Sequence, residues 1–313
     1  MKKLFVLKKQ FPLMARDEVL ALARSSEFRL QNDILILDTN RDLTTRLAQT
    51  RSVHEFLFSC SLSSLNSCVE AFPWKKVFKK DFYVGVHGST AVRTGELAKS
   101  IGEKLGHPPV NVRNSSTRID FFVRGKKVFV GLNGVELSHG YEKRKAHLRP
   151  AHHPSSMHPS LAATMVNLTG IWKGTFVDPM CGTGGLLIEA GLMGLSLRGY
   201  DNDPAMIRRC QENMEHFGLD ATLVVKDATL LNTPMKFVAT DVPYGRMTKK
   251  IDRSTLYLDF LMMLRRTLRE RAVVVFPHFA RYDQLIVRAK LKKVSEYSVY
   301  IHKTLTRKVV VLT

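Results

Sequence analysis

The sequence predicts a mixed α/β fold, in which a parallel sheet covered by helices on both faces follows a smaller α+β region. The main observation is a regular alternation of short apolar runs and helical segments from residue 161 onward, which is typical of such a sheet. A second observation is the length of 313 residues, for which two or three domains are expected. A third is the apolar fraction of 44%, which is enough for packed cores and excludes a disordered chain.

The elements before residue 137 are short and mixed in type. Apolar runs predict strands over residues 3–7, 34–37 and 82–86, and alternation on both sides of Gly125 predicts a hairpin of strands 118–123 and 128–132. Helical spacing predicts helices over residues 15–24, 43–58, 62–72 and 91–105. We therefore expect two small domains in this region, residues 1–50 and residues 51–136.

The next segment, residues 137–159, combines basic residues, histidines and prolines with little periodicity. This pattern predicts a linker with a basic face. Residues 160–313 then form the domain with the parallel sheet. Its predicted strands are 175–178, 197–201, 221–225, 237–241, 272–276, 294–302 and 305–312. Its predicted helices are 161–169, 185–193, 204–217, 255–268 and 281–289. The last two strands adjoin in sequence and can pair antiparallel.

The charge balance points to a polyanionic partner. The formal net charge is +20, from 48 Lys and Arg against 28 Asp and Glu. Lysines and arginines that face phosphates release condensed counterions, so a nucleic acid is the expected partner. The alternative is a basic surface that serves only solubility.

The sequence also bears on where the protein acts. Its basic N-terminus lacks the long apolar region and cleavage site of a secretory signal. No stretch reaches the roughly 18 apolar residues that a membrane helix needs. The four cysteines show no zinc or redox spacing, which indicates a reduced, intracellular protein. We expect a cytoplasmic monomer that does not contact membranes.

A glycine-rich turn marks the first predicted strand of the C-terminal domain. Asp178 ends that strand, and Gly182 and Gly184 lie in the turn before the next helix. Glycines let the backbone pass close under a ligand, and amides at the helix N-terminus can receive its polar groups. Leu187 occupies the place of the third glycine of the dinucleotide motif, which argues against NAD.

Two carboxylates follow at the ends of the next two strands. Asp201 can accept hydrogen bonds from ribose hydroxyls, as acidic residues at this place do in nucleotide-binding folds. The alternative for Asp201 is a helix-capping role beside Asp203. Asp227, followed by Ala228, can accept a bond from an adenine amine, or it can be an ordinary polar residue at a strand end. Both carboxylates suit a nucleotide cofactor.

The fourth strand ends in residues 241–244, Asp-Val-Pro-Tyr, which we call the clamp. An exocyclic amine of a nucleobase is a poor nucleophile, and Asp241 together with a backbone carbonyl can accept its hydrogen bonds and favour the positive charge that develops. Pro243 stiffens the turn, and Tyr244 can stack on a base that has left its stack. The glycine turn and the clamp in this order predict methyl transfer to an exocyclic nitrogen of a nucleobase.

Other polar groups are less specific. His152, His153 and His158 have irregular spacing and no cysteine or acidic partners, so no metal site is expected. Two basic runs could contact phosphates, and the first follows the clamp directly. The first run is Arg246, Lys249, Lys250 and Arg253, and the second is Arg265, Arg266, Arg269 and Arg271. The second run ends a helix, where cations also complement the helix dipole.

These motifs together resemble the archaeal THUMP-domain tRNA (guanine(10)-N2)-methyltransferase family, and the resemblance covers nearly the whole chain. Residues 83–85 through 140–141 carry it in the THUMP region, and residues 149–154 and 157–162 carry it in the connection. The glycine turn, 178–184, and the clamp with Gly245 and Arg246 carry it in the C-terminal domain.

The resemblance implies a ferredoxin-like region over residues 1–50, a THUMP domain over 51–136 and a Rossmann-like methyltransferase domain with a seven-stranded sheet. It also implies S-adenosylmethionine as methyl donor and tRNA as partner. The residues that it assigns to the donor site are Asp178, Gly182, Gly184, Asp201, Asn202, Asp227 and Ala228. It assigns the guanine amine to Asp241, with Pro243 and the stacking Tyr244 beside it, and it implies one and then a second methylation at N2.

One position departs from the family. Val242 stands where proline is usual. Two alternatives therefore remain open at this point. The first is an amine methyltransferase with another target, such as another tRNA position, rRNA guanine, DNA adenine or a glutamine side chain. The second is a tRNA-binding module without catalysis, whose clamp has degenerated at Val242.

Overall fold

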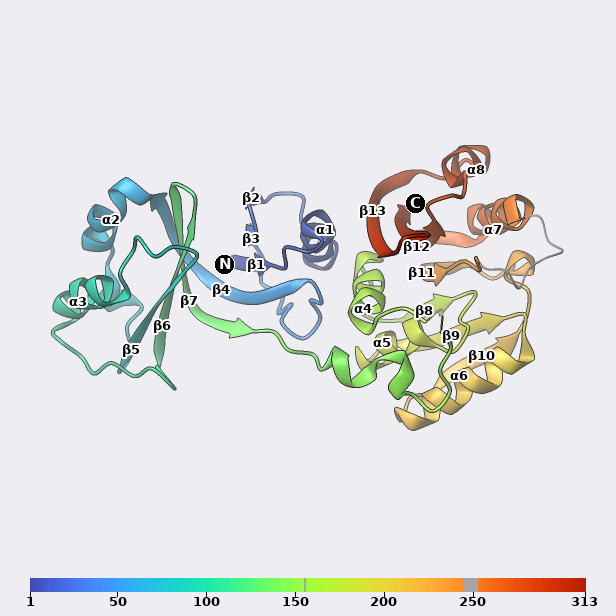
Figure 1. The fold of residues 1–313 in the computed structure, drawn as a ribbon, viewed down its shortest axis with the longest axis horizontal. Helices are drawn as coiled ribbons and strands as arrows, with labels where there is room; N and C mark the ends of the chain where they lie inside the picture. The colour runs from blue at the N-terminus through green and yellow to red at the C-terminus, as the bar shows by residue number, and fades with distance from the viewer. Residues whose placement is uncertain (155, 245–252) are drawn as a thin grey trace. The chain divides into compact units, whose positions relative to one another are not determined.

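The computed structural model describes residues 1–154, 156–244 and 253–313, and these form two compact units (Figure 1). Unit 1 consists of residues 1–9, 25–44 and 50–137. Unit 2 consists of residues 10–24, 45–49 and 138–313. Each unit is built on a seven-stranded sheet. Among the described residues, no helix is long and apolar enough to cross a membrane.

Unit 1 has one continuous sheet with the strand order β2-β3-β1-β4-β7-β6-β5. Its strands are β1 (Lys2–Leu7), β2 (Arg29–Gln31), β3 (Ile34–Asp38), β4 (Thr50–Ser61), β5 (Phe82–His87), β6 (Thr117–Arg124) and β7 (Lys127–Glu136). Helices α2 (Leu65–Ala71) and α3 (Thr94–Leu105) bury Val69 and Ile101 against Phe121 and Val130 of the sheet. The predicted hairpin of β6 and β7 is confirmed as an antiparallel pair.

Strand β4 corrects one prediction, the helix over residues 43–58. The chain from Thr50 to Ser61 is instead a strand that pairs with β1 on one side and β7 on the other. Two ladders satisfy its backbone on both edges, and its valine and phenylalanines suit a pleated surface. This tertiary pairing outweighs the helical spacing of the apolar residues.

Unit 2 contains the predicted parallel sheet, with the strand order β10-β9-β8-β11-β12-β14-β13. Its strands are β8 (Thr175–Asp178), β9 (Ser196–Asp201), β10 (Ala221–Val225), β11 (Met235–Asp241), β12 (Leu268–Pro277), β13 (Lys293–His302) and β14 (Leu305–Leu312). The first five are parallel to one another, and β14 and β13 complete the sheet in antiparallel pairing. Its helices are α1 (Pro12–Ala23), α4 (Pro159–Leu168), α5 (Gly185–Leu192), α6 (Pro204–His216), α7 (Arg253–Thr267) and α8 (Tyr282–Arg288).

Both faces of this sheet are covered, as the strand-helix alternation predicts. On one face, Val309 and Val311 pack in a core with residues of α4, α5 and α6. On the other face, Val310 and Leu312 pack in a core with residues of α7 and α8. The alternation along β14 separates the two cores, which leaves the ends of the strands as the places where a ligand can bind.

Helix α1 belongs to unit 2 because a buried carboxylate joins it to α4. Glu18 is fully buried and accepts hydrogen bonds from Ala48 N at 2.9 Å, Gln49 N at 2.8 Å and Asn167 Nδ2 at 2.7 Å. Arg46 in turn donates to Asn167 Oδ1 and, at 2.9 Å, to the Ile171 carbonyl. A buried charge needs such partners, so residues 10–24 and 45–49 are held to the sheet of unit 2.

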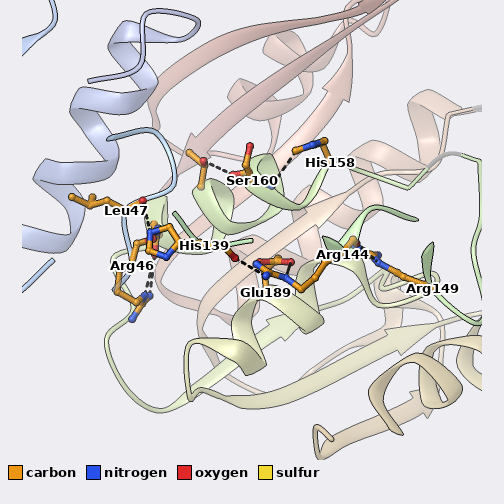
Figure 2. A network of polar contacts seen from close by, with 10 residues as sticks. Arg46, Leu47, His139, Arg144, Arg149, His158, Ser160 and Glu189 are labelled. Carbon is orange, nitrogen blue, oxygen red and sulfur yellow. Dashed lines mark hydrogen bonds and ion pairs between the residues drawn. The ribbon is translucent and has the colours of Figure 1, made fainter. Parts of the chain in front are cut away.

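Two arginines of the segment from residue 138 to 159 form hydrogen bonds within unit 2 (Figure 2). Arg144 forms two hydrogen bonds with Glu189, at 3.0 and 2.9 Å, and a third with the His139 carbonyl at 2.6 Å. Arg149 donates through Nε to the Arg144 carbonyl at 2.9 Å. His158 Nδ1 accepts the Ser160 amide at the start of α4. These contacts fix the course of the segment toward α4 and α5.

Candidate active site

The predicted site residues of unit 2 lie at the carboxyl ends of neighbouring strands. From β8 the chain continues to β9 and β10 on one side, whereas β11 and β12 lie on the other side of β8. Ligands bind in open α/β sheets at such a switch of direction. Asp178, Asp201 and Asp241 are the last residues of β8, β9 and β11. The topology therefore brings the glycine turn and the clamp to one edge of the sheet.

The glycine turn folds over the end of β9. The amide of Cys181 donates to the Tyr200 carbonyl at 2.8 Å, and the amide of Gly182 donates to Asp201 Oδ2 at 2.9 Å. Gly184 has a φ of +82°, and a Cβ there would lie 2.7 Å from Cys210 Sγ. Only glycine fits this position, and α5 begins directly after it.

Asp201 and Asp227, the two carboxylates predicted for the donor site, accept hydrogen bonds from nearby backbone amides. Asp201 Oδ1 accepts the amide of Asp203 at 3.0 Å, and Asp203 itself caps α6. Asp227 is exposed and caps the short 3-10 turn that begins at Ala228, with Thr229 N at 2.8 Å. The amide of Lys226 donates to the Asp201 carbonyl at 2.9 Å, which keeps the ends of β9 and β10 together. Asn202 is exposed and Ala228 is buried, and their binding roles stay predictions.

Negative charge is concentrated where the strands end. Asp178 is buried and accepts the Met180 amide at 3.2 Å. Burial raises the pKa of Asp178 to about 7, and the charges of Asp201 and Asp241 act in the same direction. Burial also raises the pKa of Asp241 to about 6. Carboxylates that share one edge of a sheet favour a cationic ligand, because a positive charge there relieves their mutual repulsion.

The clamp contains a hydrogen-bonded triad that includes a residue which the sequence analysis missed. Tyr244 donates its hydroxyl hydrogen to Asp241 Oδ2 at 3.1 Å. Arg307 of β14 forms an ion pair with the same oxygen through Nη2 at 3.1 Å, and its Nε donates to the Tyr244 hydroxyl at 2.5 Å. The guanidinium carbon of Arg307 also lies 5.8 Å from the centroid of the Tyr244 ring, within the range of a cation–π contact.

The other carboxylate oxygen of Asp241 differs from Oδ2. Asp241 Oδ1 is buried and has no hydrogen-bond partner within the described part of the chain. A buried acceptor without a donor costs about 1–3 kcal/mol. The site therefore lacks one donor, which a bound N–H group can supply.

The clamp turn is fixed by its backbone. Val242 is buried, and its amide donates to the Val275 carbonyl at 3.2 Å. Proline has no amide hydrogen, so the departure at Val242 adds a bond to β12 that the usual residue cannot form. Tyr257 of α7 donates its hydroxyl hydrogen to the Pro243 carbonyl at 3.0 Å. Gly245, Arg246, Lys249, Lys250 and the side chain of Arg253 lie outside the described residues.

A second arginine without a sequence-based prediction lies beside the glycine turn. Arg149 is 4% exposed, and its Nη1 and Nη2 atoms are buried without a partner in the described ranges. A Cβ on Gly185 would lie 3.3 Å from Arg149 Nη1, so the guanidinium contacts the first turn of α5. A buried cation next to a helix N-terminus favours an anion such as a carboxylate.

Comparison with protein families matches residues 146–307 of this chain to the RMKL-like methyltransferase domain family. Two curated archaeal relatives extend the match beyond that domain. The tRNA (guanine(10)-N2)-dimethyltransferase of Methanothermobacter thermautotrophicus is 31% identical over 85% of this chain and 82% of its own length. The protein of the same name from Pyrococcus abyssi is 31% identical over 95% of this chain and 94% of its own length.

A solved structure supports the fold. The crystal structure of TrmN from Thermus thermophilus aligns with 100% of this chain and 99% of its own, with a TM-score of 0.51 and 18% identity. At this identity the likeness concerns the architecture alone.

Proposed function

The chain belongs to the tRNA (guanine(10)-N2)-dimethyltransferase family, and we propose that it transfers methyl groups from S-adenosylmethionine to the exocyclic N2 of guanosine 10 in tRNA, first once and then a second time. The observation that carries this proposal is the buried Oδ1 of Asp241, which has no hydrogen-bond partner among the described residues and lies at the sheet edge where the glycine turn also lies. A carboxylate at this place suits an amine that must be held close to a cationic donor.

The donor site is proposed at the ends of β8, β9 and β10. Gly182 and Gly184 allow close approach of the ligand, Asp201 with Asn202 binds the ribose, and Asp227 with Ala228 binds the adenine. The carboxylate of Asp178 favours the positive charge of the sulfonium. Arg149 and the first turn of α5 suit the carboxylate of the methionyl group. When bound, S-adenosylmethionine supplies the methyl group, carried on its positively charged sulfur.

The clamp is proposed to hold the base. Asp241 Oδ1 accepts a hydrogen from N2, so that the nitrogen lone pair is oriented toward the methyl group. Tyr244, which is half-buried, provides its ring for stacking on the flipped guanine. The bond between N2 and the methyl carbon would form as the bond from that carbon to the donor sulfur breaks, with the neutral thioether as leaving group. N2 would gain positive charge and then lose a proton to Asp241. Asp241 stabilises that charge, and Pro243 together with Tyr257 keeps the turn in place.

For the chain before residue 137 we propose the finer architecture that the resemblance implies, namely a ferredoxin-like region over residues 1–50 and a THUMP domain over 51–136. A linker over 137–159 and the methyltransferase domain over 160–313 complete this division. The net charge of +20 supports tRNA as the partner. We also propose a cytoplasmic monomer, and light scattering of the purified protein should return the mass of one chain.

A panel of substrates tests the proposed function. The purified protein is incubated with methyl-labelled donor and with tRNA transcript, an rRNA fragment, duplex DNA or protein extract. Label should enter tRNA alone, and a transcript with adenosine in place of guanosine 10 should stay unlabelled. Label in another polymer, or equal label in the altered transcript, would reject the assignment.

A further inference from the structure

We propose that Arg307 is a specificity-determining residue that donates a hydrogen bond to O6 of the target guanine and so restricts the clamp to this base. The inference rests on the proposed function and adds to it a residue that reads the base. It starts from the position of Arg307, which is 5% exposed although it carries a charge. Arginine is rarely buried to this extent unless it is paired with another group.

Arg307 lies at an inward-facing position of β14. Val309 and Val311 point into the core that α4, α5 and α6 cover, and position 307 continues this alternation. A valine or leucine would fill an inward position near the end of a strand. Arg307 instead extends to the clamp, where it contacts both Asp241 and Tyr244. Its location is therefore tied to the two residues that are proposed to hold the base.

The hydrogen-bonding groups of guanine match those of the clamp. Along its Watson–Crick edge, guanine presents two donors, N2–H and N1–H, and then one acceptor, O6. The clamp presents a matching order: Asp241 Oδ1, to which no described residue donates, then Asp241 Oδ2, and then Arg307 Nη2 at 3.1 Å from Oδ2. N2–H pairs with Oδ1, and N1–H takes the place of the Tyr244 hydroxyl at Oδ2. The guanidinium of Arg307 then lies beside O6 of guanine and can donate a hydrogen bond to it.

Adenine, the competing base, does not match the hydrogen-bonding groups of the clamp. Adenine presents an acceptor at N1 and a donor at N6. Its N1 would face a carboxylate oxygen, which only accepts, and its N6 hydrogens would face a guanidinium, which only donates. A site built for hydrogen bonds rejects a ligand that leaves its buried groups unpaired. The pair of Asp241 and Arg307 would therefore discriminate against adenine at two positions, N1 and N6, whereas a clamp with the carboxylate alone would do so only at N1.

A chemical double-mutant cycle tests this pairing. The wild-type protein, Arg307→Gln and Arg307→Lys are assayed in single turnover on ligated tRNA with guanosine or 6-thioguanosine at the target position. Sulfur is a weak acceptor, and N1–H and N2 remain unchanged. The matched control is Lys308→Gln, because Lys308 is the next residue on β14 and bonds to Ser298 and Glu296 instead.

The wild-type protein and Lys308→Gln should methylate guanosine at least about 10-fold faster than 6-thioguanosine. Both Arg307 variants should lose most of this preference, with a ratio below about 2-fold. Variants that keep the wild-type ratio would overturn the inference. Failure of the wild-type protein to methylate any tRNA would reject the proposed function instead. The affinity for S-adenosylmethionine, measured by calorimetry, should be equal in all four proteins. Equal affinity shows that the variants fold.

Discussion

Arg307 and Asp241 form an ion pair across the edge of the sheet, with Nη2 of the arginine 3.1 Å from Oδ2 of the aspartate. The pair arises because β14 runs antiparallel to β12, so its first residues lie at the edge where β11 ends. The arginine supports the aspartate in two ways. Its positive charge opposes the effect of burial on the carboxyl group, and its bond to Tyr244 fixes the ring next to it. The ion pair thus fixes the positions of the two residues that are proposed to hold the base.

The ionisation of Asp241 predicts an acid limb in the pH profile. The pKa of Asp241 is raised to about 6 by burial, and the carboxylate form is the stronger acceptor for the amine hydrogen and the form that stabilises positive charge on N2. The single-turnover rate should therefore rise with pH through about 6 and level off above it. The charge of Arg307 lowers this pKa, so Arg307→Gln should move the limb to higher pH. An unmoved limb in the variant would show that the two groups are not coupled.

The ionisation of Asp178 predicts a pH-dependent donor affinity. Burial raises the pKa of Asp178 to about 7, and its charged form attracts the sulfonium. The affinity for S-adenosylmethionine should rise with pH through about 7 and then stay constant, with protons released on binding at lower pH. Calorimetry in two buffers of different ionisation enthalpy measures both effects. Asp178→Asn should abolish the dependence, and S-adenosylhomocysteine, which lacks the positive sulfur, should show a weaker one.

The Nη1 and Nη2 atoms of Arg149, which have no partner in the part of the chain that the structure describes, predict a preference for ligands with a carboxylate. Arg149→Met should weaken the binding of S-adenosylhomocysteine by about 10-fold or more, since a charged hydrogen-bond partner is lost. The same change should leave the binding of 5′-methylthioadenosine, which has no carboxylate, within about 2-fold. Calorimetry with the two ligands provides the comparison. Equal losses for both would mean that Arg149 acts on the fold and not on the carboxylate.

The amide of Val242 predicts that the usual residue of the family destabilises this chain. Val242→Pro removes the bond to the Val275 carbonyl and should cost about 1–3 kcal/mol in the free energy of unfolding. Thermal denaturation measures the change against Val242→Ala, which keeps the amide and loses only side-chain packing. A higher midpoint for the proline variant than for the alanine variant would contradict this account of the turn.

The sequence carries most of the information on the C-terminal sheet, because strand-helix alternation is a local signal. The prediction over residues 43–58 was wrong, because the pairing of β4 with β1 and β7 depends on partners distant in sequence. Asp178, Gly182 and Asp241 could be proposed as site residues from the sequence because each ends or follows an apolar strand. Arg307 and Arg149 could not, since their roles depend on tertiary contacts. One signal at Arg307 was available, a cation at an inward position of an alternating strand.

The central claim is that Asp241 holds the guanine amine beside the methyl donor. Mass spectrometry of nucleosides from tRNA incubated with donor and either wild-type protein or Asp241→Ala tests it most directly, with donor affinity measured in parallel. The account predicts N2-methylguanosine and then N2,N2-dimethylguanosine with the wild-type protein, and a rate at least about 100-fold lower with Asp241→Ala at unchanged donor affinity. Equal yields of methylated guanosine from both proteins would contradict it.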